Sequence, residues 1–293
     1  TRGTPLVNLV PLADQERVQT MISVPNLSVK GFVLIATRRG IIKRMDFSNL
    51  STIRSNGLIA MVMKPGDELV SVRTCSEDDE VLMITEQGQS IRFSVTQVPS
   101  RVTRATGGVK GIRLLQDDKL VGMDVAVPGL RLLTVSKRGS GKLTPVNSFP
   151  QQRRGGQGVR AFRITPKTGV VAEAQVIVDC IELMIVSTTG FIIRIPMKGI
   201  PVLGRNTQGV SIWRPPSAND FVASVACIGD EEEKIAEDTK NSAKKNDKSR
   251  SRAMGRAQKN GGKSNGSTDT LPEDVGSADD AVESDSEEDH EET

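Results

Sequence analysis

The sequence repeats itself at intervals of about 50 residues over most of its length. In each repeat a short apolar run ends in Thr or Ser, a turn with a glycine follows, and a second extended run carries basic residues. The turn glycines are 48, 51 and 51 residues apart, at Gly40, Gly88, Gly139 and Gly190. A second glycine series keeps the same period, at Gly3, Gly57, Gly108, Gly158 and Gly209. Two independent landmarks with one period indicate a repeat architecture.

The local chemistry of each repeat is that of β-strands. Val, Ile and Thr are abundant, and the short runs are separated by Gly, Pro, Asn and Asp. A Thr-x-x-Gly turn between two runs is typical of a tight hairpin, because glycine adopts positive φ without steric cost. Continuous apolar runs such as Val81–Thr85 and Met184–Ser187 predict strands that are buried on both faces. In the first repeat we expect strands near Val18–Val24, Phe32–Thr37, Ile41–Asp46 and Leu58–Met63.

This pattern predicts an all-β, propeller-like fold. A period close to 50 residues leaves room for about four strands, so we expect about four four-stranded blades. The predicted units are residues 3–56, 57–107, 108–157 and 158–208, with a closing strand in 209–229. A helical solenoid is excluded because no 3.6-residue periodicity is present. An irregular β-sandwich with coincidental spacing remains the alternative.

Charge is distributed unevenly along the chain. Residues 1–229 hold 29 Lys and Arg against 17 Asp and Glu, whereas residues 230–293 hold 10 against 19. The second segment cannot bury enough apolar surface to offset ordering entropy, which predicts a disordered tail that is acidic at its end. A basic body attracts phosphate, and a polyanion on the same chain competes for that surface.

The side-chain inventory excludes much catalytic chemistry. The only histidine, His290, lies in the tail, and tyrosine is absent, so a tyrosine that attacks DNA phosphate cannot lie in this chain. Cys75, Cys180 and Cys227 fit no metal-binding or redox spacing, and we expect reduced core thiols in a cytoplasmic protein. No catalytic residue, metal site, cofactor or membrane span is expected.

One junction has a concentrated basic pattern. In the segment 151–160, three glycines let the backbone approach a partner, and successive N–H groups form a nest for a phosphate oxygen. Arg153, Arg154 and Arg160 add planar cationic groups to the same turn. A flexible loop that happens to be basic explains the same pattern.

The heptapeptide Gln152–Gly158 closely resembles the gyrase-A box of the DNA gyrase A subunit family. Six of its seven positions match, and Gln157 stands where the family usually has Lys or Arg. The segments Gly3–Leu12 and Lys142–Val146 resemble an interblade segment of that family's C-terminal domain and the strand that leads into a box. The resemblance covers nearly all of residues 1–229, and the tail resembles the variable acidic tails of such subunits.

The resemblance implies a β-pinwheel, a propeller-like disc in which neighbouring blades exchange strands. Its basic rim wraps duplex DNA, and the parent gyrase introduces negative supercoils with ATP hydrolysed on the B subunit. The expected partners are duplex DNA, the breakage-reunion part of the A subunit, which carries the DNA-cleaving tyrosine, and the gyrase B subunit. The chain by itself is then no enzyme. Its expected location is the bacterial cytoplasm, in association with the nucleoid, and an organellar origin stays open.

Two departures from the family pattern keep alternatives open. Family members generally have about six blades with the box near the first, whereas this chain shows four units with the box in the third. It therefore resembles an N-terminally truncated fragment, and ring closure is open. A topoisomerase IV C-terminal domain is the second interpretation, and a protein-interaction propeller the third. A propeller hydrolase would need convergent acids, but the acids found here suit turns better: Asp67, Asp78, Asp79, Asp117 and Asp118.

We expect the basic residues at strand-end turns to form a DNA-binding track. No aromatic residues are interleaved with them, which favours duplex over single-stranded DNA and little sequence preference. The alternative for any one of these Arg and Lys residues is that it only makes the protein surface more soluble. The track comprises the box residues Gln152, Arg153, Arg154, Gly155, Gly156, Gln157 and Gly158, together with Arg160, Arg38, Arg39, Lys43, Arg44, Arg92, Arg101, Arg104, Lys137, Arg138, Lys142, Arg194 and Arg205.

Overall fold

The computed structural model describes residues 8, 12, 16–24, 29–50, 57–100 and 106–229. The chain divides into two compact units, residues 1–237 and 238–293, and all the described residues lie in the first. The predicted disordered tail therefore lies outside the described residues. In the described part, the regular elements are strands and four one-turn 3-10 helices: η2 (Phe47–Leu50), η3 (Val95–Gln97), η4 (Val146–Ser148) and η5 (Met197–Gly199).

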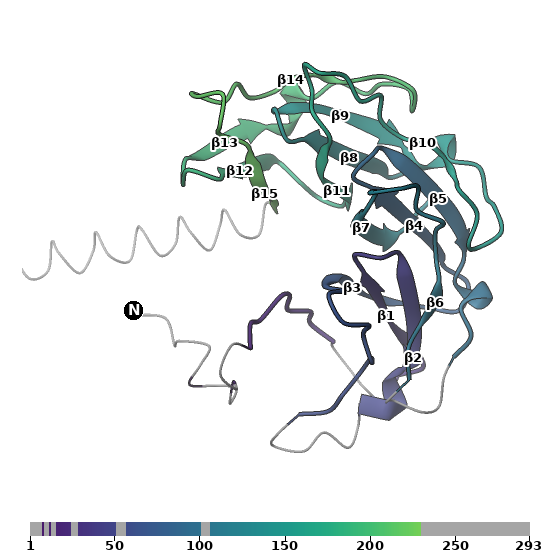
Figure 1. The fold of residues 1–293 in the computed structure, drawn as a ribbon. Coiled ribbons are helices and arrows are strands. Elements are labelled where there is room, and N and C mark those ends of the chain that lie inside the picture. Colours follow the sequence, from purple (N-terminus) through teal and green to yellow (C-terminus); the bar gives the residue numbers. More distant parts are fainter. Residues whose placement is uncertain are drawn as a thin grey trace, which may run out of the picture. The chain divides into compact units, whose positions relative to one another are not determined.

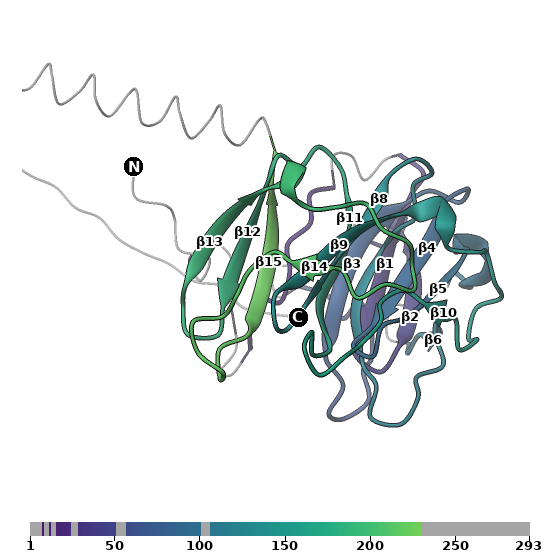
Figure 2. The same ribbon diagram turned by 90° about the horizontal axis from the view of Figure 1, so that it is seen from above.

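Four antiparallel sheets follow one another in chain order (Figures 1 and 2). The first has the order β3-β1-β2-β6, with β1 (Phe32–Thr37), β2 (Ile41–Asp46), β3 (Leu69–Cys75) and β6 (Val109–Lys110). The second has the order β7-β4-β5-β10, with β4 (Glu80–Thr85), β5 (Gln89–Ser94), β7 (Leu120–Val125) and β10 (Val159–Arg160). The third has the order β11-β8-β9-β14, with β8 (Arg131–Ser136), β9 (Ser140–Pro145), β11 (Val171–Ile177) and β14 (Val210–Ser211). The fourth has three strands, β15-β12-β13, with β12 (Glu182–Ser187), β13 (Ile192–Pro196) and β15 (Val222–Ile228).

The prediction of an all-β repeat with four blades is confirmed. In the first blade the hairpin strands Phe32–Thr37 and Ile41–Asp46 are confirmed at both ends. The strands expected at Val18–Val24 and Leu58–Met63 are wrong, because the structure places neither segment in a strand. Their apolar residues Val24, Ala60 and Met61 instead pack against the face of the first sheet.

The outermost strand of each of the first three sheets comes from the following repeat. Strand β6 pairs with β2, β10 with β5, and β14 with β9. The exchanged segment is also held at its end by the hairpin turn. Gly139 O, for example, accepts hydrogen bonds from Ile212 N and Trp213 N at 3.0 and 3.1 Å. Each exchange therefore ties one repeat to the next through main-chain hydrogen bonds.

Strand exchange explains glycines of both series, such as Gly139 and Gly158. Gly139 has a φ of 76°, and a Cβ there would lie 2.3 Å from Trp213 O of the exchanged segment. Gly158 has a φ of 78°, and a Cβ there would lie 2.1 Å from Ser90 O of the preceding blade. Gly190 also has positive φ, but a Cβ there would meet nothing within 4 Å, because among the described residues no exchanged strand pairs with the fourth sheet.

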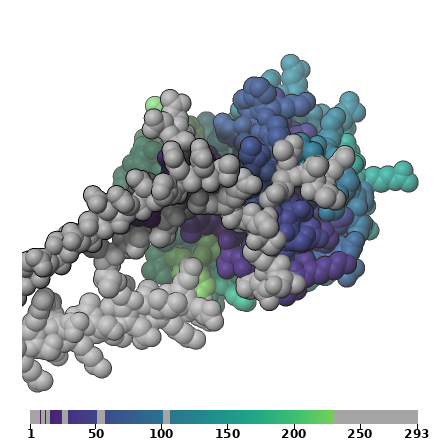
Figure 3. Space-filling view, turned by 90° about the horizontal axis from the view of Figure 1, so that it is seen from below, coloured from purple at the N-terminus to yellow at the C-terminus, as the bar shows by residue number. Residues whose placement is uncertain are grey.

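Neighbouring sheets share their hydrophobic cores, because side chains of the middle strand point alternately to opposite faces. In β4, Val81 and Met83 pack with residues of the first sheet, whereas Leu82 and Ile84 pack with residues of the third. The inner strands β3, β7, β11 and β15 contact one another in sequence. Figure 3 shows one face of these repeats, on which blue atoms of the earlier repeats lie beside teal atoms of the later ones. Two-sided burial is thus confirmed for Val81–Thr85.

The same expectation is wrong for Met184–Ser187. In β12 the side chains alternate between buried and half-buried. Leu183 and Ile185 join the core shared with the third sheet, whereas Met184 and Val186 point to the other face. In the described part of the chain, no further sheet follows to cover that face.

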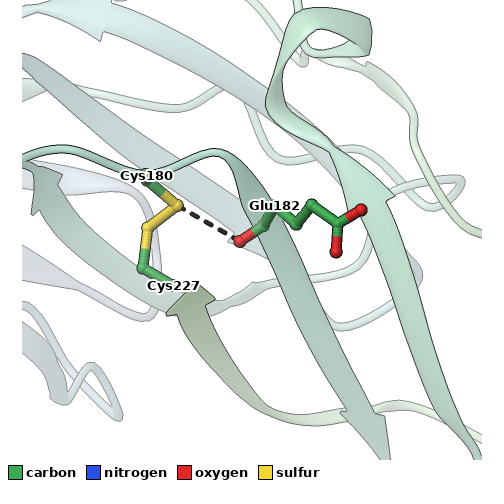
Figure 4. Close-up of a disulfide and its surroundings, with 3 residues drawn as sticks. All are labelled: Cys180, Glu182 and Cys227. Atoms are coloured by element: carbon green, nitrogen blue, oxygen red, sulfur yellow. Dashed lines mark hydrogen bonds between the residues drawn. A yellow bond between two sulfur atoms is a disulfide. The ribbon is translucent and has the colours of Figure 1, made fainter. Parts of the chain in front are cut away.

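The cysteines differ from the sequence expectation. Cys75 is buried and free, as expected, but Cys180 and Cys227 form a disulfide with a Cα–Cα distance of 5.5 Å (Figure 4). Cys180 precedes β12, and Cys227 in β15 lies opposite Leu183 of β12. Strand pairing thus joins two residues 47 apart in sequence, which no local cysteine motif could indicate.

Substituting the two hairpin glycines separates strand exchange from backbone strain. Gly139→Ala and Gly190→Ala share the penalty of a left-handed backbone, about 1–2 kcal/mol. Only Gly139→Ala also displaces the exchanged segment, so we expect it to lower the free energy of unfolding by at least about 1 kcal/mol more than Gly190→Ala. Urea denaturation measures both. Equal losses would contradict a role for Gly139 in strand exchange.

Candidate nucleic-acid interface

The basic turn Gln152–Gly158 lies at the junction of the first two sheets. Gln152 N donates to Arg92 O of β5 at 2.7 Å, and Gly155 N donates to Gly111 O at 2.7 Å. Gly155 and Gly158 have φ of 83° and 78°, conformations that only glycine adopts freely. The turn is therefore a fixed part of the strand-exchange junction rather than a loose loop.

The two arginines of this turn differ in their surroundings. Arg154 is half-buried, and its Nε donates to Gln97 O at 2.9 Å. Its Nη1 donates to Lys110 O, and its backbone N donates to Gln97 Oε1. Arg153 is exposed, and its guanidinium has no hydrogen bond or ion pair among the described residues. Arg154 thus secures the turn, and Arg153 remains available to a partner.

The following repeat contains the same arrangement in weaker form. Arg205 Nη1 donates to Arg160 O at 3.1 Å. This hydrogen bond corresponds to the one from Arg154 to Lys110 in the preceding repeat. Arg160 is exposed, and its Nη1 donates to Asn206 Oδ1 at 3.3 Å. The predicted residues Arg101 and Arg104 of the preceding repeat lie outside the described residues.

Lys43 and Lys142 are the clearest correction to the predicted track. Lys142 is fully buried, and its Nζ donates to Gly204 O at 2.8 Å, Arg205 O at 2.7 Å and Thr207 Oγ1 at 3.2 Å. Lys43 is also buried, and its Nζ donates to Ala60 O and Thr106 O. Both ammonium groups hold interblade segments in place, so neither is positioned for a direct phosphate contact.

Burial also changes the titration of these lysines. Desolvation, together with the charge of Arg205, lowers the pKa of Lys142 to about 8. Desolvation lowers the pKa of Lys43 as well. No sequence pattern indicates this burial, because both lysines stand in hairpin strands rich in polar residues.

Other predicted residues have partners within their own blade or, for Lys137, in the preceding blade. Arg44 is buried with its guanidinium 4.5 Å from the centroid of the Phe32 ring. Ion pairs join Arg38 to Glu68, Arg92 to Glu80, Lys137 to Glu86 and Arg194 to Glu182. Arg39 and Arg138 are exposed at hairpin turns, and Arg138 Nη1 donates to Pro166 O. Of the exposed arginines in the predicted set, Arg39 and Arg138 lie at hairpin turns and Arg153 at the basic turn, whereas Arg160 lies in β10 and Arg194 in β13.

Three of the exposed arginines that the predicted track omits share one position in the repeat: Arg113, Arg163 and Arg214. Each stands five residues after a glycine of the second series, Gly108, Gly158 or Gly209. The repeat period alone could have revealed them, but they lie in the segment that follows each exchanged strand, outside both the hairpins and the box.

The acids named at the sequence level are turn residues where the structure describes their contacts. Oδ1 of Asp67 accepts from Arg39 N, and Oδ1 of Asp118 accepts from Gln87 N. Asp220 Oδ1 accepts from Thr189 N in the same way. Asp220 follows Asp118 by two repeat intervals of 51 residues. The described residues contain no cluster of three or more metal-ligating side chains. Nor do they include a helix with the length and hydropathy needed to cross a membrane.

These features define a strand-exchanged β-propeller with basic turns at its blade junctions. A family model for the DNA gyrase C-terminal domain, a β-propeller, matches residues 31–76, 79–126, 131–177 and 182–228. The chain is 42% identical over 234 residues to the DNA gyrase A subunit of Dehalogenimonas lykanthroporepellens, covering 78% of this chain and 28% of that protein. It is 33% identical over 233 residues to the Mycolicibacterium smegmatis protein of the same name, covering 79% and 28%.

Solved structures show the same fold. A DNA gyrase A C-terminal domain superposes with a TM-score of 0.68 at 23% identity, covering 78% of this chain and 76% of that one. A DNA topoisomerase IV C-terminal domain superposes with a TM-score of 0.72 at 22% identity, covering 82% and 75%. The chain belongs to the DNA gyrase A C-terminal domain family. It spans little more than a quarter of the length of the curated relatives it matches.

Lys142→Met should change how stability depends on pH. Because the pKa of Lys142 is about 8 in the folded state against 10.5 ordinarily, the unfolded chain binds more protons between these values, and stability rises with pH there. We expect the free energy of unfolding of the native protein to rise by about 2 kcal/mol relative to Lys142→Met between pH 7.5 and 9.5. Urea denaturation at both pH values measures this.

The exposed residue Lys198 provides the matched control. Lys198→Met should leave the pH dependence of the native protein unchanged. A Lys142→Met profile parallel to the native one would show that the ammonium group is not desolvated.

Proposed function

We propose that the chain binds and wraps duplex DNA on the basic turns at its blade junctions, with little sequence preference. The observation that supports this most is the turn Gln152–Gly158, which presents the exposed guanidinium of Arg153 while Arg154 fixes the backbone. The N–H groups of Gln152, Arg154 and Gly155 already donate within the fold, so the planar cation of Arg153 is the group of this rigid turn that suits a phosphate oxygen.

Wrapping is energetically reasonable for a surface of this kind. Smooth bending of a 20–30 bp segment costs about 1–6 kcal/mol. Each neutralised phosphate releases counterions, and several such contacts offset the bending energy at moderate salt, as in histone–DNA complexes without base-specific contacts. The repeat places comparable basic turns at successive junctions, so the contacts follow the blades rather than a single patch.

We place this activity in the C-terminal part of a gyrase A subunit that supports ATP-dependent negative supercoiling in the cytoplasm. The chain then acts without catalytic residues or a cofactor of its own. Its partners in the complex are the breakage-reunion part of the same polypeptide and the gyrase B subunit. A topoisomerase IV role is the second candidate, supported by the TM-score of 0.72. The nearly complete box at Gln152–Gly158 favours gyrase.

Single substitutions in the basic turn should separate binding from stability. Arg153→Ala should lower the salt slope of duplex binding by about 0.9, the loss of one phosphate contact, without changing the melting temperature. Arg154→Ala should lower the free energy of unfolding by about 1–3 kcal/mol, because it removes hydrogen bonds to Gln97 and Lys110. Fluorescence anisotropy across a salt series and thermal denaturation give the two readouts.

Arg131→Ala removes an exposed charge away from the turn and serves as the control. If Arg153→Ala binds duplex like this control, Arg153 makes no phosphate contact.

The acidic end of the chain should weaken DNA binding. Residues 264–293 contain 12 acids and no Lys or Arg, and a tethered polyanion has a high effective concentration near the basic turns. Deleting these residues should tighten duplex binding at low salt and have little effect at high salt, where charges are screened. Affinity that is unchanged at low salt would refute competition by the tail.

A further inference from the structure

Arg113, Arg163 and Arg214, which lie outside the predicted track, share one structural position. Their intervals of 50 and 51 residues match the repeat. Each side chain is exposed, and none of the three guanidinium groups has a hydrogen bond or ion pair with another described residue. They therefore differ from Arg38, Arg92 and Arg194, whose charges are paired within their own blades.

The main chain fixes these arginines at the hairpin end of each blade. The residue before each arginine donates its N–H to a hairpin glycine, as Trp213 N does to Gly139 O. Arg113 N itself donates to Gly156 O of the box at 2.8 Å, and Arg163 N donates to Thr207 O at 3.0 Å in the next repeat. The backbone of Arg113 therefore lies beside the box, and the backbone of Arg163 lies beside the turn that corresponds to the box in the next repeat.

The third arginine also lines a hollow of about 610 Å³. Arg138 and Lys167 contribute two further exposed cations to its wall, and Ser140 and Ser211 contribute hydroxyl groups. The one acid in the wall, Asp220, is buried and accepts hydrogen bonds from Thr188 Oγ1, Thr189 N and Phe221 N. The wall of the hollow thus carries three cations and one acid, and the acid already accepts hydrogen bonds within a turn. This charge balance favours the binding of an anion in the hollow.

We propose that Arg113, Arg163 and Arg214 form an arginine ladder that contacts the phosphate backbone of duplex DNA, one contact per blade junction, and that the hollow beside Arg214 binds one of these phosphates. This proposal rests on the proposed function and adds contacts outside the box. Guanidinium groups form bidentate hydrogen bonds with phosphate. Guanidinium groups at regular intervals suit the regularly spaced phosphates of a duplex. Contacts to phosphates do not distinguish one base sequence from another.

The test compares two triple variants of the full chain that lose the same charge. Arg113→Ala/Arg163→Ala/Arg214→Ala removes the ladder. Lys30→Ala/Arg131→Ala/Lys198→Ala removes three exposed bases at the opposite ends of the strands, since Lys30 precedes β1, Arg131 begins β8 and Lys198 follows β13. Binding to a duplex of about 40 bp, longer than the 20–30 bp segment considered for bending, is measured from low to moderate salt for both variants and the native chain.

We expect the ladder variant to lower the salt slope by between two and three, because each lost phosphate contact removes about 0.9. Its affinity at low salt should fall at least tenfold, whereas the control variant should lose at most threefold. Equal losses in the two variants would overturn the ladder. A native chain without a steep salt slope would instead overturn the proposed function itself, so the two failures are distinguishable.

Two further variants decide the chemistry of the occupant. The corresponding triple Arg→Lys variant keeps the charge, and we expect it to retain most of the salt slope while losing affinity, because lysine cannot form the bidentate contact. Arg138→Ala/Lys167→Ala should lower the slope by about one to two if the hollow seats a phosphate. If the ladder variant instead loses affinity for polyglutamate but not for duplex, the surface serves an acidic protein, and the proposal is wrong.

Discussion

Each of the first three blades is completed by its neighbour, because its outermost strand belongs to the following repeat. This exchange fixes the glycines of both series, since a side chain at Gly139 or Gly158 would occupy the space of a neighbouring main chain. It also fixes the basic turn Gln152–Gly158, whose hydrogen bonds reach both the first and the second blade. The candidate binding surface is thus a consequence of how the repeats are joined.

The same junctions sort the basic residues into two roles. Lys43 and Lys142 are buried and donate to carbonyl groups of the interblade segments, so their ammonium groups connect the repeats through hydrogen bonds. Arg153 and the arginine ladder are exposed next to those joints. A net basic charge therefore overstates the basic surface that is available to a partner, because part of the charge is buried inside the fold. The exposed remainder repeats with the blades, which is the distribution a wrapped polyanion requires.

Much of this fold could be predicted from the glycine period and the hairpin pattern. The hairpin Phe32–Asp46 is predicted correctly because its turn and its apolar strands are local signals. Leu58–Met63 is predicted wrongly because apolar residues that pack on a sheet face resemble a strand in sequence. The Cys180–Cys227 disulfide and the burial of Lys142 depend on contacts between residues far apart in the chain. Arg113, Arg163 and Arg214 follow the period but carry no motif of their own.

The most direct test of DNA wrapping is a change in linking number. A nicked circular plasmid is ligated in the presence of increasing amounts of the full chain, and its topoisomers are separated after the protein is removed. If the chain wraps DNA, the topoisomer distribution shifts steadily in one direction as binding increases, because wrapped DNA traps writhe. An unshifted distribution at saturating protein would show that the chain binds DNA without wrapping it, and would contradict the central claim.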